Sequence, residues 1–282
     1  MVTVVKTTGS MISTLDASNL SYELERVRVK SPNLTEVSKV LAAAQQEKKI
    51  PSNLEYIDDF YDAYTGTSGT AFKDKNTGKV VVSYTGTNPS GDFGMDISTD
   101  MYSIGFGIGY HYDNAYTFYE KMAEKYGADN LILTGHSLGG NVAQRVALKY
   151  NARMTIVYNP APLYVKSIAL KDDERVVNNI QDIEKEMESF TGRVLRINTE
   201  GDFLQHSALV GGVYLGEKFT LVNSGGHGLD SIVNDSAQVA ELERILAIEF
   251  GMSSITDKKL QFIHSSREGI SGVTKSQWIY LD

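Results

Sequence analysis

Residues 131–140 read LILTGHSLGG, an apolar run followed by a serine that has one glycine two positions before it and another two positions after it. The apolar run predicts a buried strand, and the residues from about Asn141 onward predict a helix. A serine between these elements is typical of a nucleophile elbow, in which only glycine allows the neighbouring backbone to approach so closely. We therefore expect the hydroxyl of Ser137 to be held at the carboxyl end of a strand.

The rest of the chain alternates strand-like and helix-like segments around this turn. Strands are expected at residues 70–74, 79–84, 155–158, 193–198 and 218–223. Helices are expected at residues 33–48, 176–190 and 239–250. The first two strands read as a hairpin, and the later rhythm of strand and helix favours parallel pairing. The sequence thus predicts an α/β fold with a mostly parallel central sheet flanked by helices.

The length and composition of the chain limit the kinds of function that it can have. The chain has 282 residues, 41% of them hydrophobic, which is enough for one large α/β domain with additions. Its net charge of -8 disfavours nucleic acid as a partner. With 0 cysteines, it has no disulfide and no thiolate site. We find no transmembrane segment and no cleavable signal peptide, so we expect a cytoplasmic protein or one secreted without a recognisable cleaved signal.

A serine nucleophile needs a base and a carboxylate that orients the base, and both are expected after later strands. Asp202 closes the turn that follows residues 193–198, and His227 closes the turn that follows residues 218–223. Because the carboxyl ends of parallel strands share one edge of a sheet, these two side chains are expected to lie near Ser137.

The chain has 5 histidines, so the choice of base is open to alternatives. His227 is the first candidate because it follows a predicted core strand. His264 is the second, because it also comes after the acid in the chain but follows a helix-like segment. The other three are less suitable: His111 precedes the serine, His136 is expected to point away from it, and His206 lies in the same loop as the acid.

Several segments carry a resemblance to one known family. They are the strand ending in Tyr-Thr-Gly-Thr at residues 84–87, the run DFGMDI at 92–97, the run TIVYNPAP at 155–162 and the run INTEGD at 197–202. Together with the elbow and the late histidine, they resemble the class 3 lipases, the fungal-type triacylglycerol lipases of the α/β-hydrolase fold. The resemblance spans roughly residues 56–250.

The resemblance implies roles for individual residues. It implies Ser137 as nucleophile, with Asp202 and His227 as its partners. It also implies an oxyanion hole made by Thr87 and the backbone N–H of Leu138, the latter being expected from the elbow itself. Thr85 stands where the family usually has arginine. The stretch between the acid and the first candidate base is shorter than in that family, which keeps the second candidate base open.

We therefore expect a serine hydrolase that cleaves carboxylic esters of lipids, as a lipase or a phospholipase A1-like enzyme, through an acyl-enzyme intermediate. The expected partner is a lipid ester at a membrane or micelle surface. One alternative is a small-ester or thioester hydrolase, and another is a non-catalytic hydrolase-like binding module. The apolar segment 101–110, with Ile104, Phe106 and Ile108, is either a lid or a buried loop.

Three domains are expected, and no cofactor or metal. Residues 1–50 are expected to form a helical or extended N-terminal extension packed on the core. Residues 51–250 are expected to form the α/β-hydrolase catalytic domain, and residues 251–282 a C-terminal extension. The carboxylates at positions 92, 96 and 100 lack the alternating ligands and the central glycine of a calcium loop.

Overall fold

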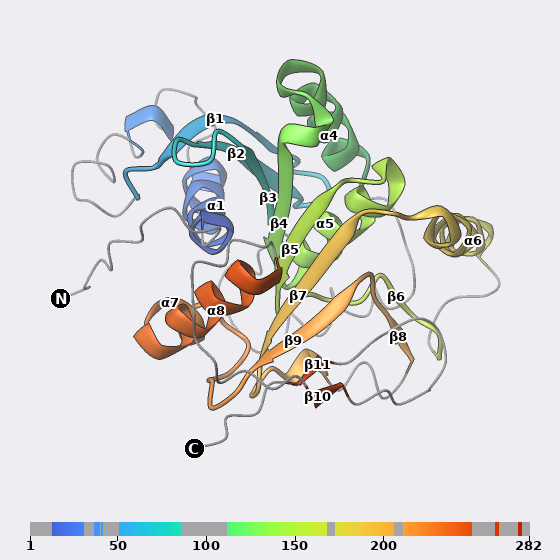
Figure 1. Ribbon diagram of the computed structural model, residues 1–282. Helices are drawn as coiled ribbons and strands as arrows, with labels where there is room; N and C mark the ends of the chain where they lie inside the picture. Colours follow the sequence, from blue (N-terminus) through green and yellow to red (C-terminus); the bar gives the residue numbers. More distant parts are fainter. Residues whose placement is uncertain are drawn as a thin grey trace.

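A computed structural model describes residues 13–30, 37–39, 41, 51–85, 112–167, 173–205, 211–249, 263–264 and 276–277. In this part of the chain, a 7-stranded sheet has the order β1-β2-β3-β4-β5-β7-β9 (Figure 1). The strands are β1 (Leu54–Tyr61), β2 (Ser68–Asp74), β3 (Val80–Thr85), β4 (Leu131–His136), β5 (Met154–Tyr158), β7 (Arg193–Thr199) and β9 (Glu217–Leu221).

The sheet is antiparallel at one side and parallel over the rest. The hairpin formed by β2 and β3 turns through residues 75–79, as the sequence predicts, and β1 pairs antiparallel with β2. From β3 onward, each neighbouring pair is parallel. The predicted mostly parallel sheet is therefore confirmed. Since β3, β4, β5, β7 and β9 run in the same direction, their carboxyl ends meet at one edge of the sheet.

Helices cover both faces of the sheet (Figure 1). The described helices are α1 (Ser13–Lys30), α4 (Asp113–Tyr126), the 3₁₀ turn η2 (Ala128–Asn130), α5 (Leu138–Tyr150), α6 (Glu174–Ser189), α7 (Asp230–Val233) and α8 (Ser236–Glu249). α4, α5 and α6 pack on one face, whereas α1, α7 and α8 pack on the other. Within the described residues, no helix is long and apolar enough to cross a bilayer.

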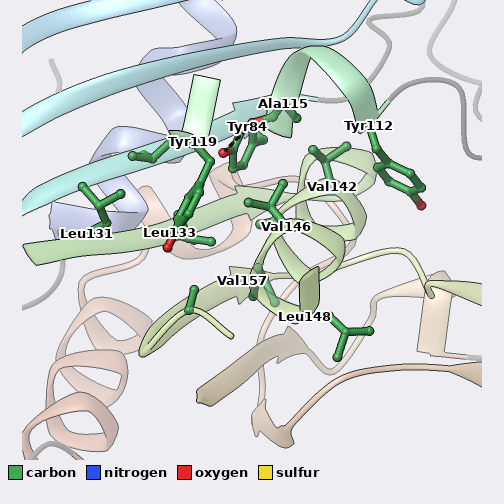
Figure 2. Packing of buried hydrophobic residues seen from close by; sticks show 14 of the residues in the cluster. Tyr84, Tyr112, Ala115, Tyr119, Leu131, Leu133, Val142, Val146, Leu148 and Val157 are labelled. Atoms are coloured by element: carbon green, nitrogen blue, oxygen red, sulfur yellow. Dashed lines mark hydrogen bonds between the residues drawn. The ribbon is translucent and has the colours of Figure 1, made fainter. Parts of the chain in front are cut away.

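The core follows the twofold alternation of the strands. On β3, Val82 and Tyr84 pack with α4 and α5, whereas Val81 packs with α1 on the opposite face. Figure 2 shows how the first of these faces is filled, with Val142 and Val146 of α5 close to the strands. Both faces of the central strands are therefore buried, which explains their nearly continuous apolar sequences.

Two short two-stranded sheets lie outside the central one. One pairs β6 (Tyr164–Val165) with β8 (Gly212–Val213), and the other pairs β10 (Ile263–His264) with β11 (Ser276–Gln277). His264, the second candidate base, thus lies in a strand that is separate from the central sheet.

The bounds of the N-terminal helix α1 could not be predicted from the sequence, which indicates only a helical or extended segment within residues 1–50. Leu15, Ala17, Leu20 and Leu24 are buried against the sheet, but between them α1 also buries serine and threonine side chains. Because the helix face that meets the sheet is partly polar, α1 lacks the apolar stripe by which a surface helix is usually recognised. Of the helix expected at residues 33–48, only residues 37–39 and 41 are described, and these are helical.

Candidate active site

Ser137 lies in a strained turn between β4 and α5. Its backbone has φ 56° and ψ -121°, a region that few residues other than glycine adopt. The turn needs glycine at its flanks, because a Cβ on Gly139 would collide with the backbone carbonyl of Tyr84 on β3. α5 begins at Leu138, three residues before the expected start near Asn141, since Ser137 itself is the N-cap. The strained geometry sets the serine at the tip of the turn.

The backbone of Ser137 is fixed by the neighbouring strand. Its N–H donates to the carbonyl of Tyr158 at 3.1 Å, and its own carbonyl accepts from the N–H of Ala161 at 2.9 Å. The N–H of Asn141 in α5 reaches the same carbonyl at 3.2 Å. These bonds hold the turn between β4 and β5, so the hydroxyl has a defined position at the edge of the sheet.

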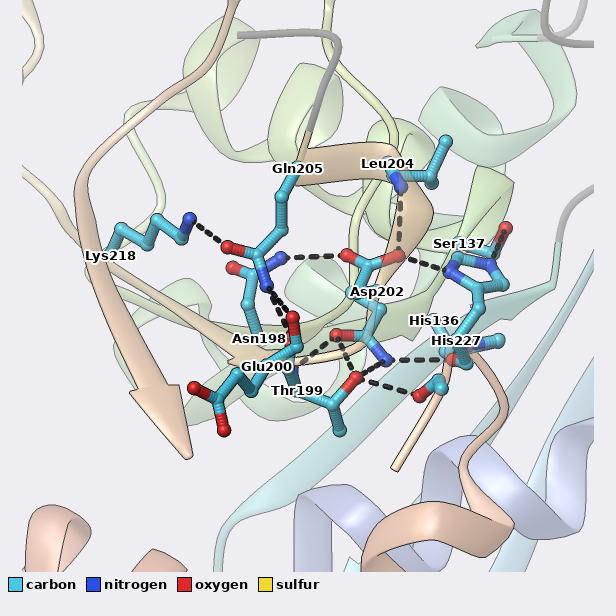
Figure 3. A network of polar contacts seen from close by, with 12 residues as sticks. His136, Ser137, Asn198, Thr199, Glu200, Asp202, Leu204, Gln205, Lys218 and His227 are labelled. Carbon is cyan, nitrogen blue, oxygen red and sulfur yellow. Dashed lines mark hydrogen bonds and ion pairs between the residues drawn. The ribbon is translucent and has the colours of Figure 1, made fainter. Parts of the chain in front are cut away.

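The structure brings Ser137, His227 and Asp202 together (Figure 3). The Oγ of Ser137 lies 2.8 Å from Nε2 of His227, and Nδ1 of the same ring lies 2.7 Å from Oδ1 of Asp202. The three residues follow β4, β9 and β7, respectively. Residues that are far apart in the sequence therefore form one continuous chain of hydrogen bonds.

The carboxylate of Asp202 is fully buried, and both of its oxygens are satisfied. Oδ1 accepts a hydrogen bond from the backbone N–H of Leu204 at 3.0 Å. Oδ2 accepts one from the side-chain amide of Asn198 at 3.0 Å. The side chain of Asp202 is 0% exposed and that of His227 is 12% exposed. Hydrogen bonds to the ionised form stabilise a carboxylate that burial would otherwise disfavour.

Two side chains hold the backbone of His227. The amide of Asn159 donates to the carbonyl of His227 at 2.7 Å, and Nε2 of His136 lies 2.8 Å from the same oxygen. Asn159 also accepts a bond from the N–H of Thr199, at 2.7 Å, so it links the ends of β5 and β7 to the loop of His227. The supporting role of these two side chains was not predicted from the sequence, although Asn159 directly follows a predicted strand.

His136 is buried and neutral. Burial, with a contribution from the nearby ring of His227, lowers the pKa of His136 to about 3. Because a carbonyl oxygen only accepts hydrogen bonds, the ring proton of His136 is on Nε2, which donates to His227. The sequence predicts that His136 points away from the serine; in the structure its ring lies 4.8 Å from the ring of His227.

Apolar side chains lie next to the three hydrogen-bonded residues. Leu138, Ala161 and Leu204 form a small buried cluster. Phe203, which directly follows the acid, is 45% exposed, and its ring lies 4.7 Å from the ring of His227. The site therefore offers apolar surface beside the imidazole of His227.

Other expected site residues are described only in part. Leu138 is the first residue of α5, where a backbone N–H has no acceptor within its own helix. Thr87, Ile104, Phe106 and Ile108 lie outside the described residues. Among the described residues, no group of three His, Cys, Asp or Glu side chains could hold a metal ion.

Comparison with known protein families identifies one family that matches most of this chain. The family described as phospholipase-like, Tle-like phospholipase domain, matches residues 37–240. A comparison with curated proteins finds no significant match.

Among solved structures, the chain is similar to a lipase from Rhizopus microsporus var. chinensis, with 13% identity, 79% of this chain and 78% of that chain covered, and a TM-score of 0.46. It is similar to lipase II from Rhizopus niveus, with 12% identity, 76% of this chain and 81% of that chain covered, and a TM-score of 0.44. It is also similar to a triacylglycerol lipase from Penicillium expansum, with 18% identity, 60% of this chain and 70% of that chain covered, and a TM-score of 0.41.

Proposed function

Because this chain belongs to the family of Tle-like phospholipase domains and hydrolyses lipid esters, we propose that Ser137, His227 and Asp202 form its catalytic triad. The observation that carries this proposal is the pair of hydrogen bonds, 2.8 Å and 2.7 Å, that joins the three side chains. A nucleophile, a base and an orienting carboxylate in this order are the parts that acyl transfer to serine requires.

The proposed reaction has two steps. Nε2 of His227 takes the proton of Ser137 as Oγ attacks the carbonyl carbon of the ester. The tetrahedral intermediate collapses, His227 passes the proton to the leaving alcohol, and an acyl group stays on the serine. A water molecule, deprotonated by the same imidazole, then releases the fatty acid. Asp202 remains ionised throughout and stabilises the imidazolium at Nδ1.

The oxyanion of each intermediate needs donors beside the serine. We assign one to the N–H of Leu138 at the N-terminus of α5, where the helix dipole also favours negative charge. We assign the other to Thr87, which follows β3 by two residues. β3 is the parallel neighbour of β4, the strand that leads into the serine turn.

Phospholipids cleaved at an acyl ester, as by a phospholipase A, are the proposed substrates. The half-exposed ring of Phe203 beside His227 offers apolar contact to an acyl chain at the reacting carbonyl. We assign catalysis to residues 51–250, with residues 1–50 and 251–282 as extensions of that domain.

The experiment is product analysis on phosphatidylcholine vesicles with Ser137→Ala as the test variant. We expect wild-type protein to release fatty acid and lysophospholipid, and Ser137→Ala to lower the rate on the order of 10⁴-fold with unchanged thermal stability. Ser189→Ala is the matched control, since this serine lies at the exposed end of α6.

Each alternative has its own result. Release of the phosphorylated headgroup would overturn acyl-ester cleavage. Rapid hydrolysis of short p-nitrophenyl esters or acyl thioesters, with none on vesicles, would favour a small-ester or thioester hydrolase. A folded Ser137→Ala variant that binds vesicles like the wild type, with no turnover by either protein, would favour a binding module.

A further inference from the structure

Helix α1 docks on the sheet through a polar seam, which we define as Thr14, Ser18 and Tyr22. These residues are four apart, so they lie on one face of the helix. Thr14 Oγ1 lies 2.7 Å from the hydroxyl of Tyr158, and Ser18 Oγ lies 3.0 Å from Oγ1 of Thr134. The seam therefore fixes the register of α1 against β4 and β5 by hydrogen bonds.

The last member of the seam reaches the active site. The hydroxyl of Tyr22 lies 3.1 Å from Nδ1 of His136 and 3.0 Å from its backbone oxygen. The two rings meet edge to face with centroids 5.7 Å apart. Nε2 of the same histidine lies 2.8 Å from the carbonyl of His227. One hydrogen-bonded path thus runs from α1 through His136 to the backbone of the proposed base.

Burial and the hydrogen-bond partners determine the protonation states of His136 and Tyr22. Burial keeps His136 neutral, with its pKa lowered to about 3, so its ring carries one proton. That proton is on Nε2, which leaves Nδ1 as an acceptor. Nδ1 shares the single proton of the Tyr22 hydroxyl with the backbone oxygen of His136. Burial also raises the pKa of Tyr22, so its hydroxyl keeps the proton that it donates. The tyrosine therefore stabilises the tautomer that bonds to His227.

The loop of His227 depends on such anchors. His227 lies in the run Ser224-Gly225-Gly226-His227-Gly228, and glycine loses more backbone freedom on ordering than any other residue. Its carbonyl accepts hydrogen bonds from the side chains of both Asn159 and His136. A loss of either bond would widen the range of positions of the imidazole relative to Ser137.

We propose that Tyr22 and His136 are positioning residues, through which α1 holds His227 in bonding distance of the nucleophile. This inference rests on the proposed function, because it requires His227 to be the base. α1 precedes residues 37–240, the part of the chain that the family describes, so this support for the base comes from outside the family's domain.

The test compares Tyr22→Phe with Ser18→Ala in the full chain. Each variant removes one hydroxyl of the polar seam, but only Tyr22 contacts His136. We expect Tyr22→Phe to lower kcat on a soluble p-nitrophenyl ester on the order of tenfold, with KM changed less than about twofold, because the base is misplaced and the substrate contacts are not. Ser18→Ala is expected to lower Tm and to leave kcat unchanged.

A second pair of variants tests His136 itself. His136→Gln keeps a side-chain N–H that can donate to the carbonyl of His227, whereas His136→Leu keeps the volume without a donor. We expect His136→Leu to lose kcat by at least as much as Tyr22→Phe, and His136→Gln to recover most of it. Equal kcat in Tyr22→Phe and Ser18→Ala, or no difference between the two His136 variants, would overturn the inference.

Labelling of Ser137 by a fluorophosphonate separates this outcome from failure of the proposed function. If the wild type is not labelled, or if Ser137→Ala keeps its activity, the triad is wrong and the inference falls with it. If the wild type is labelled and Tyr22→Phe is labelled at the same rate, the triad stands and the positioning role alone is wrong.

Discussion

The carboxylate of Asp202 is completely buried against the imidazole of His227, with Oδ1 2.7 Å from Nδ1. The same carboxylate accepts N–H donors from Asn198 and Leu204. Every hydrogen bond that it makes in the described structure is one that an anion accepts, so the site is built around a negative charge at this position.

The first prediction concerns that charge. Asp202→Asn should lower kcat about 10⁴-fold while the protein stays folded. The new amide must turn an N–H either toward His227, where it selects the wrong tautomer, or toward the donor of Asn198. Steady-state kinetics on a soluble ester and a thermal melt test this. A variant with more than a tenth of the wild-type kcat would remove Asp202 from the proposed triad.

The second prediction separates the two candidate bases. His227→Ala should be nearly as damaging as Ser137→Ala, because both remove the proton transfer, and their combination should add little. His264→Ala should keep most of the activity, since β10 is separate from the central sheet. Rates for the three single variants and the double variant decide the question. A reversed order of damage would move the base to residues 251–282.

Much of this arrangement could be predicted from the sequence, because the central strands are buried on both faces. Their apolar runs, each closed by a glycine-rich or polar turn, predict the parallel sheet and place Ser137, Asp202 and His227 after strand ends. The α/β fold is confirmed by the strand pairing. The catalytic roles of these side chains stay predictions.

The supporting residues could not be predicted in the same way. Tyr22 and His136 meet because polar residues on one face of α1 dock on polar residues of β4, and the spacing of polar residues in one segment does not identify the other segment as its partner. Asn159 adopts a positive φ of 41° and bonds to the end of β7 and to the loop of His227, and both features depend on the assembled sheet edge. Such contacts are set by tertiary packing rather than by local preference.

The third prediction tests the close packing of the serine turn. Gly139→Ala should lower the free energy of unfolding by about 3 kcal/mol, because its Cβ would collide with the backbone of Tyr84 rather than with a side chain that can move. Gly226→Ala is the control: a Cβ there meets nothing within 4 Å, so its stability should stay within about 0.5 kcal/mol. Urea denaturation measures both. Equal stabilities would show that the turn can relax.

The fourth prediction is a pH dependence of stability. The pKa of His136 is lowered by burial from 6.5 to about 3, so below pH 6.5 the unfolded chain takes up a proton that the folded protein does not. Stability due to His136 is therefore lost as the pH falls from 6.5, at up to about 1.4 kcal/mol per pH unit. Asp16 has the opposite effect, since burial raises its pKa from 3.8 to about 6.

The two effects are separated by comparing the wild type with His136→Gln at several pH values. Asp16 contributes to both proteins, so the difference in unfolding free energy isolates the histidine. We expect the wild type to lose stability relative to the variant between pH 6.5 and 4. Parallel stability curves would mean that His136 titrates normally in the folded protein.

The last prediction concerns the segment 101–110, whose role as a lid stays a prediction because it lies outside the described residues. A lipid surface can shift a closed lid toward the open form only by binding the open form better, through apolar side chains that opening exposes. Replacing Ile104, Phe106 and Ile108 by serine should then lower activity on phospholipid vesicles on the order of tenfold and leave hydrolysis of a short soluble ester nearly unchanged. Rates on the two substrates, measured on the same preparation, give this ratio directly. Equal losses on both substrates would identify the segment as a packed structural loop.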